Sequence, residues 1–531
     1  MTNFKNRLSE IKHIVVLMLE NRSFDNMLGW LYDPDNAPPF KQVPRGQQFE
    51  GVSGKKLTNP VPAAFGDGVA KVGKGTDMQG PHPNPNEAYA DVYGQLFGHN
   101  PPPAFIPNET SPPSMQGFVN NYAEAIKAYN KHHLLHKSHT GPGSIMNCFT
   151  PDMVPVISTL ANAYAVCDHW FSSAPTETFP NRSFVHAGTS SGHVYNNWKT
   201  GILPWDIGLF INHTPTIFNL LEEAGQSWKI YHGGSLLTCF AYLLQSQIQH
   251  FATTDPETNR FFSMDQFWHD AAAPATGPDS LPSYSFIEPR YFSSLKHGPE
   301  NDAHPAYLPI DIDGPSNVLQ AEILIRDVYQ ALRNSPNWEH TLLIITFDEH
   351  GGCYDHVPPP AAVSPDGIVI PPPHAGGRAE GSGFEFNRLG VRVPAILVSP
   401  WIEAGTVCNT VFDHTSIIKT IIECFGLKDA HGNQATLLAR EAAANSVGDV
   451  LTLAAPRTDT PVITARPAPV ESEPAERLLM GIHKDLLLLA AHHLGKLGRT
   501  LIDLSQIQTR EQAAALLDEH SKLLANAAKM K

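Results

Sequence analysis

The strongest constraint on the fold comes from continuous apolar runs that alternate with stretches of helical spacing. Two of these runs, Lys12–Leu19 and Thr341–Phe347, consist mostly of apolar side chains, and the second is rich in β-branched residues. A strand that is apolar on both faces is buried on both faces, which is typical of parallel sheets covered by helices on each side. The chain is therefore predicted to be an α/β protein with a mostly parallel sheet sandwiched by helices.

Shorter segments fit the same architecture. Trp228–Tyr231, Ser283–Ile287 and Val393–Val398 are predicted to be further strands. Thr216–Ala224 and Ser316–Leu332 show the spacing of amphipathic helices between them. Sheets of this kind bind their ligands beyond the carboxyl ends of the strands, so the residues that follow each strand are the first candidates for a functional site.

The length and composition suggest one large domain with an appended segment. The 531 residues are 42% hydrophobic and 17% charged, which allows a large core and argues against a disordered chain. We interpret residues 1–448 as the main domain, in which the Pro-, Gly- and Asn-rich segment 34–113 forms an elaborated loop region over the sheet. Residues 449–531 are interpreted as a linker followed by a C-terminal helical tail, which packs on the main domain or on another subunit.

Charge and hydropathy restrict the partners. The formal net charge is −15 and no Lys/Arg-rich block offsets it, so nucleic acid is not expected to bind. No stretch reaches the ~18 apolar residues of a membrane span, and no classical leader is visible. A soluble, cytoplasmic protein is expected, with secretion by another route as the alternative. The six cysteines form no CxxC pair and are expected to be mostly free, buried thiols, with one or two disulfides as the alternative in an oxidising compartment.

Acidic residues follow directly after the two longest predicted strands. Glu20 and Asn21 follow the first, and Asp348 and Glu349 follow the second, just before two glycines. Oxygen-bearing side chains at a strand end could bind a cation, and glycine lets the backbone approach a ligand closely. The alternatives are that Asn21 caps a helix, that Glu20 pairs with an arginine, and that the second pair forms a salt-bridged turn.

A third candidate segment contains a hydroxyl group. Thr178 is followed by Asn181 and Arg182, whose side chains could donate hydrogen bonds to a phosphate. A hydroxyl beside a cation can be deprotonated and attack phosphorus. The alternative is a capped turn in which Arg182 is solvated or bridges two groups.

Several of the 26 histidines lie in polar, glycine- or proline-rich surroundings, among them His82, His304 and His356. A neutral imidazole can ligate a metal, and an imidazolium can hold phosphate or protonate a leaving alcohol. The alternative for each is an ordinary surface or structural histidine.

Together these segments resemble the bacterial and plant phosphoesterase family, which contains the non-specific and phosphatidylcholine-preferring phospholipases C and an acid phosphatase branch. The similarity extends over about residues 12–430, with the motifs in the expected order. The segments that carry it are Glu20–Asp25, Thr178–Arg182, Glu288–Tyr291, Asn301–Pro305, Asp348–Val357 and Val393–Trp401.

The resemblance implies an alkaline-phosphatase-like fold and a metal-activated threonine nucleophile, Thr178. It implies that His82, His304 and His356 contact phosphate or the leaving group. The implied reaction is a phospholipase C reaction on phosphatidylcholine-type lipids that releases diacylglycerol and a phosphorylated head group. An acid phosphatase and a non-catalytic binding protein are the alternatives. The metal ligands that it implies are Glu20, Asn21, Thr178, Asp348 and Glu349.

This ligand set of carboxylates, a carboxamide and a hydroxyl favours Ca²⁺, Mg²⁺ or Mn²⁺, and Zn²⁺ stays possible because histidines lie close by in the sequence. The expected partners are a phospholipid or small phosphoester substrate, a membrane surface in transient contact, and a second copy of the chain through the C-terminal helices.

Overall fold

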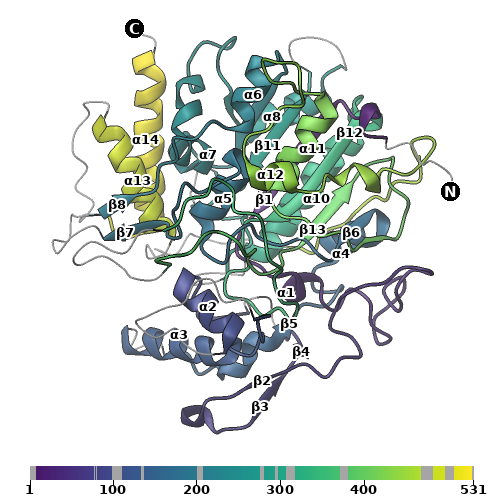
Figure 1. Ribbon diagram of the computed structural model, residues 1–531, viewed down its shortest axis with the longest axis vertical. Coiled ribbons are helices and arrows are strands. Elements are labelled where there is room, and N and C mark those ends of the chain that lie inside the picture. The colour runs from purple at the N-terminus through teal and green to yellow at the C-terminus, as the bar shows by residue number, and fades with distance from the viewer. Residues whose placement is uncertain are drawn as a thin grey trace.

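One sheet of eight strands lies at the centre of the computed structural model (Figure 1). Its strand order is β10-β9-β11-β1-β12-β13-β6-β14. The strands are β1 (His13–Leu19), β6 (Ala165–Cys167), β9 (Trp228–His232), β10 (Phe261–Ser263), β11 (Tyr284–Glu288), β12 (Thr341–Phe347), β13 (Ala395–Val398) and β14 (Thr406–Cys408). The residues that the structure describes are 7–76, 78, 80–98, 111–132, 137–199, 207–274, 280–293, 297–305, 317–370, 381–467, 482–496 and 507–528.

The sheet is parallel except at β13, which runs antiparallel to β12 and β6. β1 pairs with β12 along its whole length, from His13 opposite Thr341 to Leu19 opposite Phe347, and all seven residues of each strand are buried. This register places the residues that follow β1 beside those that follow β12. The predicted α/β class and the mostly parallel sheet are confirmed.

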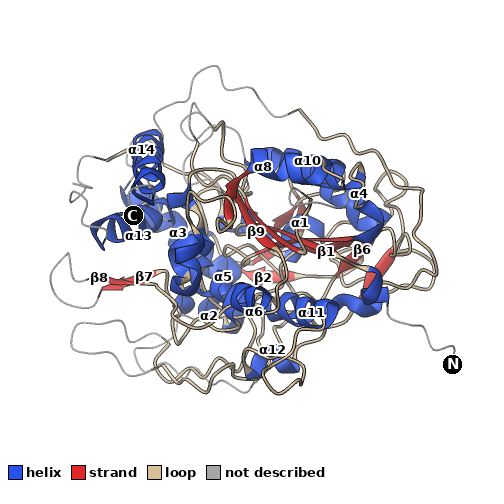
Figure 2. Ribbon diagram, turned by 90° about the horizontal axis from the view of Figure 1, so that it is seen from above, coloured by secondary structure: helices blue, strands red, loops and turns tan. Residues whose placement is uncertain are grey.

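Helices cover both faces of the sheet (Figure 2). One face carries α4 (Pro155–Ala163), α8 (Met264–Ala272) and α10 (Asn317–Arg333), and the other carries α5 (Thr178–Ala187), α6 (Ile217–Glu223) and α11 (Thr415–Phe425). The shorter elements are α1 (Phe24–Leu28), α7 (Phe240–Leu244), α12 (Ala439–Ala443), β4 (Gly73–Lys74), β5 (Asn147–Cys148), β7 (Asn197–Lys199) and β8 (Ile207–Leu209).

The segment 34–113 is more regular than a loop region. It contains α2 (Tyr89–Phe97) and the antiparallel pair β2 (Thr58–Pro60) and β3 (Val69–Lys71). The apolar side chains of α2 pack with those of α3 (Phe118–His132) in a small core of their own. Figure 1 shows these elements as a purple and blue layer below the sheet. The surrounding prolines and glycines concealed the helical spacing of α2, and residues 99–110 lie outside the described part.

The C-terminal segment packs on the main body. Tyr329 and Gln330 of α10 donate hydrogen bonds to the carbonyls of Pro461 and Ile463, at 2.8 Å each, so the segment after residue 448 follows this helix. α13 (Ile482–Lys496) and α14 (Arg510–Ala528) confirm the predicted helical tail, and their buried leucines and alanines join the main hydrophobic core. Association with a second copy through these helices stays a prediction.

All six cysteines are free thiols, four of them buried. Among the helices of the described residues, none is both long and apolar enough to cross a membrane.

Candidate active site

The segments that follow β1 and β12 meet at the carboxyl edge of the sheet. The backbone N–H of Asn21 donates a hydrogen bond to Oδ1 of Asp348, at 3.1 Å, and the N–H of Glu349 donates to the same oxygen at 2.7 Å. Glu20, Asn21, Asp348 and Glu349 are all fully buried. Two acidic segments that are more than three hundred residues apart in the sequence thus form one cluster.

Unusual backbone conformations allow this close approach. Asn21 has a φ of +57°, a left-handed conformation that asparagine tolerates better than most residues. Gly351 and Gly352 also have positive φ. A Cβ atom on Gly351 would lie 2.3 Å from the carbonyl oxygen of Asn21, and one on Gly352 would lie 2.4 Å from that of Asn86. The two glycines therefore let three chain segments come together.

Thr178 reaches the same cluster from the first turn of α5. Its side chain is fully buried, and its Oγ1 donates to Oδ1 of Asn21 at 3.4 Å. Asn181, one turn further along, points elsewhere: its Oδ1 accepts from the N–H of Ala174, and its Nδ2 donates to the carbonyls of Ala174 and Thr176. Asn181 thus ties down the turn that precedes α5.

Arg182 joins the two acidic segments. Its Nε donates to Oδ2 of Asp348 at 3.1 Å, and its Nη2 lies 3.2 Å from Oε1 of Glu20. Phe240 and Tyr291 flank the guanidinium at 4.7 and 5.3 Å from their ring centroids. Burial alone lowers the pKa of Arg182, but Tyr291 and the two carboxylates together raise it. Arg182 therefore stays charged.

The cluster holds more negative charge than this one cation balances. The pKa values of Glu20 and Glu349 are raised well above their usual range by burial and by neighbouring carboxylates. Oε2 of Glu20 and Oε1 of Glu349 are buried and accept no hydrogen bond from the described residues, and Oε1 of Glu20 has its ion pair with Arg182. Buried oxygens of this kind need a partner, and oxygen donors suit a hard divalent cation. The residues present therefore fit a metal ion.

A further carboxylate, Glu87, was not anticipated from the sequence. Its Oε2 accepts a hydrogen bond from Nδ2 of Asn21 at 2.8 Å, and burial, Glu177 and Asp348 raise its pKa to about 8. Glu87 follows the run Pro83–Asn86, which is not a strand. The rule that site residues follow strand ends therefore does not point to Glu87. Only the three-dimensional arrangement brings it to the site.

The side chain of Arg22 contacts both segments that carry the predicted site residues His82 and His304. Its Nε donates to the carbonyl of Ala303 and its Nη1 to that of Gly80, each at 2.7 Å. His304 follows Ala303, which has a φ of +78°. The Nδ1 of His304 donates to its neighbour's carbonyl at 2.8 Å, and burial lowers its pKa to about 3, so this imidazole is neutral. His82 lines a cavity of about 150 Å³ near Arg22.

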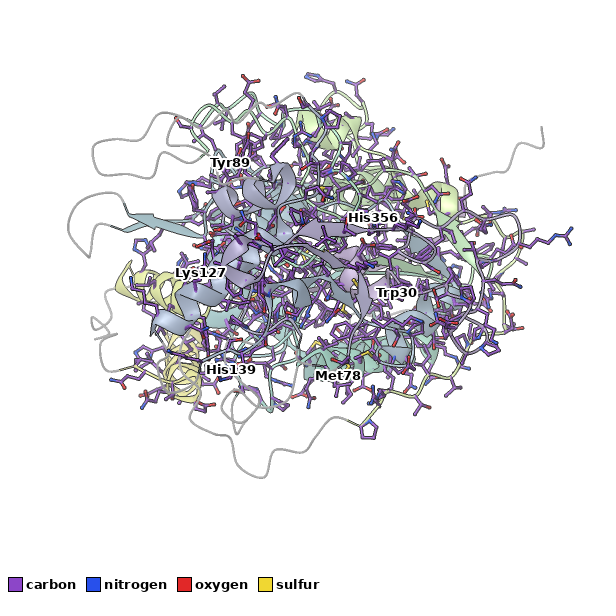
Figure 3. The ribbon with its side chains drawn as sticks, turned by 90° about the horizontal axis from the view of Figure 1, so that it is seen from below. Trp30, Met78, Tyr89, Lys127, His139 and His356 are labelled. Atoms are coloured by element: carbon purple, nitrogen blue, oxygen red, sulfur yellow. The ribbon has the colours of Figure 1, made fainter. Side chains whose placement is uncertain are left out.

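His356 belongs to a second cluster. Its Nδ1 donates to Oδ2 of Asp25 at 2.6 Å and its Nε2 to Oε1 of Glu50 at 3.0 Å. Arg392 donates to Asp25 and to Asp355, at 2.9 Å each. Figure 3 views His356 from the side on which α2 and α3 lie. Both ring nitrogens are thus engaged by carboxylates, and the predicted contact of His356 with phosphate stays a prediction.

Comparison with known proteins assigns the chain to a family. The model of the phosphoesterase family matches residues 11–428, most of the chain. The chain belongs to this phosphoesterase family. The enzyme is 35% identical over 467 residues to non-specific phospholipase C3 of Arabidopsis thaliana, covering 86% of this chain and 76% of that relative. It is 28% identical over 449 residues to phospholipase C A of Mycobacterium tuberculosis, covering 79% and 74%. The resemblance inferred from the motifs is confirmed, and the enzyme is a phosphoric ester hydrolase.

Among solved structures, the enzyme is similar to a protein of the alkaline phosphatase superfamily from Vibrio parahaemolyticus, with a TM-score of 0.28 and 12% identity, covering 51% of this chain and 60% of that one. It is also similar to human ectonucleotide pyrophosphatase/phosphodiesterase 5, with a TM-score of 0.32 and 9% identity, covering 56% and 95%. These overlaps are partial, and the family assignment rests on the sequence match.

Proposed function

We propose that the enzyme is a phospholipase C that cleaves the glycerol-side phosphodiester of phosphatidylcholine-type lipids. The names of the plant and mycobacterial relatives support this activity. The observation that carries the proposal is the position of the buried Thr178 hydroxyl, at the start of α5 and beside a cluster with an excess of carboxylates. A helix N-terminus favours an anionic group, so a phosphate ester and its nucleophile suit this place.

The five predicted ligands form the proposed metal site. The unsatisfied oxygens of Glu20 and Glu349 support this assignment, and the all-oxygen set favours Ca²⁺, Mg²⁺ or Mn²⁺, with Zn²⁺ still possible. When bound, the ion would neutralise charge on the phosphate and make the alkoxide of Thr178 easier to form. The residues that would hold it are Glu20, Asn21, Thr178, Asp348 and Glu349.

The reaction proceeds in two displacements at phosphorus. Oγ1 of Thr178 loses its proton and attacks phosphorus, and the bond from phosphorus to the glycerol oxygen breaks. The glycerol oxygen takes up a proton and leaves as diacylglycerol, while the phosphorylated head group stays esterified to Thr178. Water then attacks phosphorus, the bond to Oγ1 breaks, and the threonine recovers its proton.

Neighbouring side chains have distinct proposed roles. Nη1 of Arg182 is buried and donates no hydrogen bond to the described residues, so it is available for a phosphate oxygen. Asn181 holds the turn before α5 and in this way positions the proposed nucleophile, Thr178. His304 and His82 contact phosphate or the leaving group. Because His304 is neutral and its Nδ1 proton is donated to the carbonyl of Pro305, its Nε2 can only accept a hydrogen bond there and is not a cationic partner.

Product analysis tests the proposal. Purified enzyme with added Mn²⁺ is incubated with vesicles of phosphatidylcholine and phosphatidylethanolamine, and separately with a chromogenic phosphate monoester. Diacylglycerol and phosphocholine, identified by mass spectrometry, are the expected products. Release of inorganic phosphate from the monoester alone would contradict the proposal and favour the acid phosphatase. A protein inert on both would favour the binding protein.

A further inference from the structure

The contact between Glu87 and Asn21 fixes which end of the Asn21 carboxamide faces the nucleophile. The NH₂ of Asn21 donates to Oε2 of Glu87 at 2.8 Å. The ionised form of Glu87, which a bound cation favours, can only accept hydrogen bonds and so requires this orientation of the carboxamide. Oδ1 of Asn21 then points the other way, where it accepts from Oγ1 of Thr178. Without Glu87 the two orientations would differ much less in energy, and one of them would turn an NH₂ group toward the nucleophile and the carboxylates.

We propose that Glu87 is a positioning residue that holds the oxygen of Asn21 toward the metal site and Thr178. The proposal rests on the proposed function, because it takes Asn21 to be a metal ligand. Groups that orient a ligand typically contribute about 10–100-fold to metal affinity. Glu87 acts through Asn21 and touches neither the substrate nor the reacting atoms.

The segment that carries Glu87 is itself held against the metal-binding turn. Gly352 packs against the backbone of Asn86, where a larger residue would collide. Gln95 of α2 donates to the carbonyl of Asn86 at 2.8 Å, and its Oε1 accepts from Nε2 of His350 at 2.8 Å. One amide side chain thus connects the backbone next to Glu87 with the residue after Glu349. In this proposal, the contacts of α2 hold Glu87 in a fixed position at this edge of the sheet.

Three variants test the proposal by metal binding, independently of activity. Glu87→Leu removes the acceptor, whereas Glu87→Gln keeps an oxygen that can accept from Asn21. Glu322→Leu is the matched control, because Glu322 is also a buried glutamate, and it accepts from the backbone N–H groups of Val156 and Ile157 in α4, away from the cluster. The affinity of each metal-free protein for Mn²⁺ is measured by calorimetry, and kcat is measured at saturating Mn²⁺.

We expect Glu87→Leu to weaken Mn²⁺ binding by about 10-fold or more, with Glu87→Gln within about threefold of the wild type. Equal losses in both variants would overturn the proposal, since the charge of Glu87 would then be what matters, as for a direct ligand. Unchanged binding in Glu87→Leu would overturn it too, as would the same loss in Glu322→Leu, because general destabilisation would then explain it. A wild-type protein that binds no Mn²⁺ would instead refute the proposed metal site itself.

A second pair of variants exchanges donor and acceptor. Asn21→Asp alone places two carboxylates in contact and is expected to lower kcat at saturating Mn²⁺ by about 100-fold, as for removal of a residue that orients a catalytic group. Adding Glu87→Gln restores both the hydrogen bond and the original total charge, so the double variant is expected to regain at least about tenfold. No recovery in the double variant would show that residues 21 and 87 act independently, and would contradict the proposal.

Discussion

The enzyme contains two clusters of buried carboxylates that differ in charge balance. In the first, Arg182 is the one cation among the described residues that contacts Glu20 and Asp348, while Glu87 and Glu349 lie beside them. The first cluster therefore carries an excess of negative charge. In the second, Asp25 and Asp355 share the guanidinium of Arg392, and Asp25 also accepts a hydrogen bond from the imidazole of His356, whose pKa the carboxylates raise.

The pKa values follow this difference. Burial raises the pKa of Asp25, but His356 and Arg392 outweigh it, and the net shift is downward. In the first cluster the shifts of Glu20, Glu87 and Glu349 are all upward. The second cluster has three possible ligand atoms within 4.8 Å of one another, yet its acids are already neutralised by protein cations. For this reason the first cluster, which contains buried oxygens that accept no hydrogen bond from the described residues, is the one proposed to bind the metal.

The largest expected effect comes from removing the proposed nucleophile beside the first cluster, Thr178. Thr178→Ala should lower kcat by about 10³-fold or more, because it removes the hydroxyl on which the proposed ester with the head group forms. Steady-state hydrolysis of phosphatidylcholine measures it. Thr420→Ala is the matched control: Thr420 is a buried threonine of α11 whose hydroxyl donates to the carbonyl of Ser416. A Thr178→Ala enzyme with the wild-type rate would show that Thr178 is not the nucleophile and would contradict the chemical role proposed for the first cluster.

Neutralising one acid in each cluster should affect stability differently. Asp25→Asn leaves the buried Arg392 short of a partner and should destabilise the protein by about 3–5 kcal/mol. Glu20→Gln relieves repulsion and should leave the metal-free protein as stable as the wild type or more so. Denaturant unfolding in a chelating buffer measures both. Two losses of equal size would mean that the first cluster is also a balanced ion-pair network.

Much of the fold could be predicted because its central strands are apolar on both faces. Thr341–Phe347 was predicted with the bounds that the structure gives, and β1 within one residue. β6 and β14 have three residues each, too few for a periodic pattern to be recognised. The antiparallel direction of β13 depends on how the chain returns to the sheet, which its own residues do not encode.

The residues of the candidate site also differ in whether the sequence could predict them. Residues that directly follow strands, such as Glu20 and Asp348, could be anticipated because parallel strands end at one edge. Glu87 could not, because its position depends on the packing of Pro85 and Asn86 against Gly352. Whether His356 contacts a phosphate or Asp25 could not be decided from the sequence, because the choice depends on the fold, in which Nδ1 of His356 donates to Asp25.

The two clusters should also respond differently to pH in the metal-free protein. A carboxyl whose pKa is raised stabilises the fold below its ordinary pKa and loses that contribution as pH rises through the folded value. For Glu87 this window runs from 4.5 to about 8, so the free energy of unfolding should fall across it. Asp25, whose pKa is lowered, contributes above 3.8, and this stability is lost as pH falls through its folded pKa.

The expected decline for Glu87 is tested by measuring the free energy of unfolding at pH 5, 6, 7 and 8, with and without saturating Mn²⁺. Mn²⁺ should flatten the decline, since the ion stabilises the ionised carboxylates, and Glu87→Gln should reduce it. Glu322, whose pKa is raised to about 7 by burial elsewhere, adds a decline that Mn²⁺ should leave in place. A metal-free protein whose stability is constant from pH 5 to 8 would contradict the excess charge of the first cluster.

The smallest expected effect lies at the exposed rim of the second cluster. The side chain of Glu50 is 40% exposed, and it pairs with Lys55 and His356. Exposed pairs contribute little because water screens them, so Glu50→Gln should cost less than about 1 kcal/mol. His356→Gln should lower stability more, because Asp25 then loses a buried donor, but should change kcat by less than about tenfold. A much larger fall in kcat with unchanged stability would mean that His356 leaves Asp25 to contact the phosphate, as the sequence first suggested.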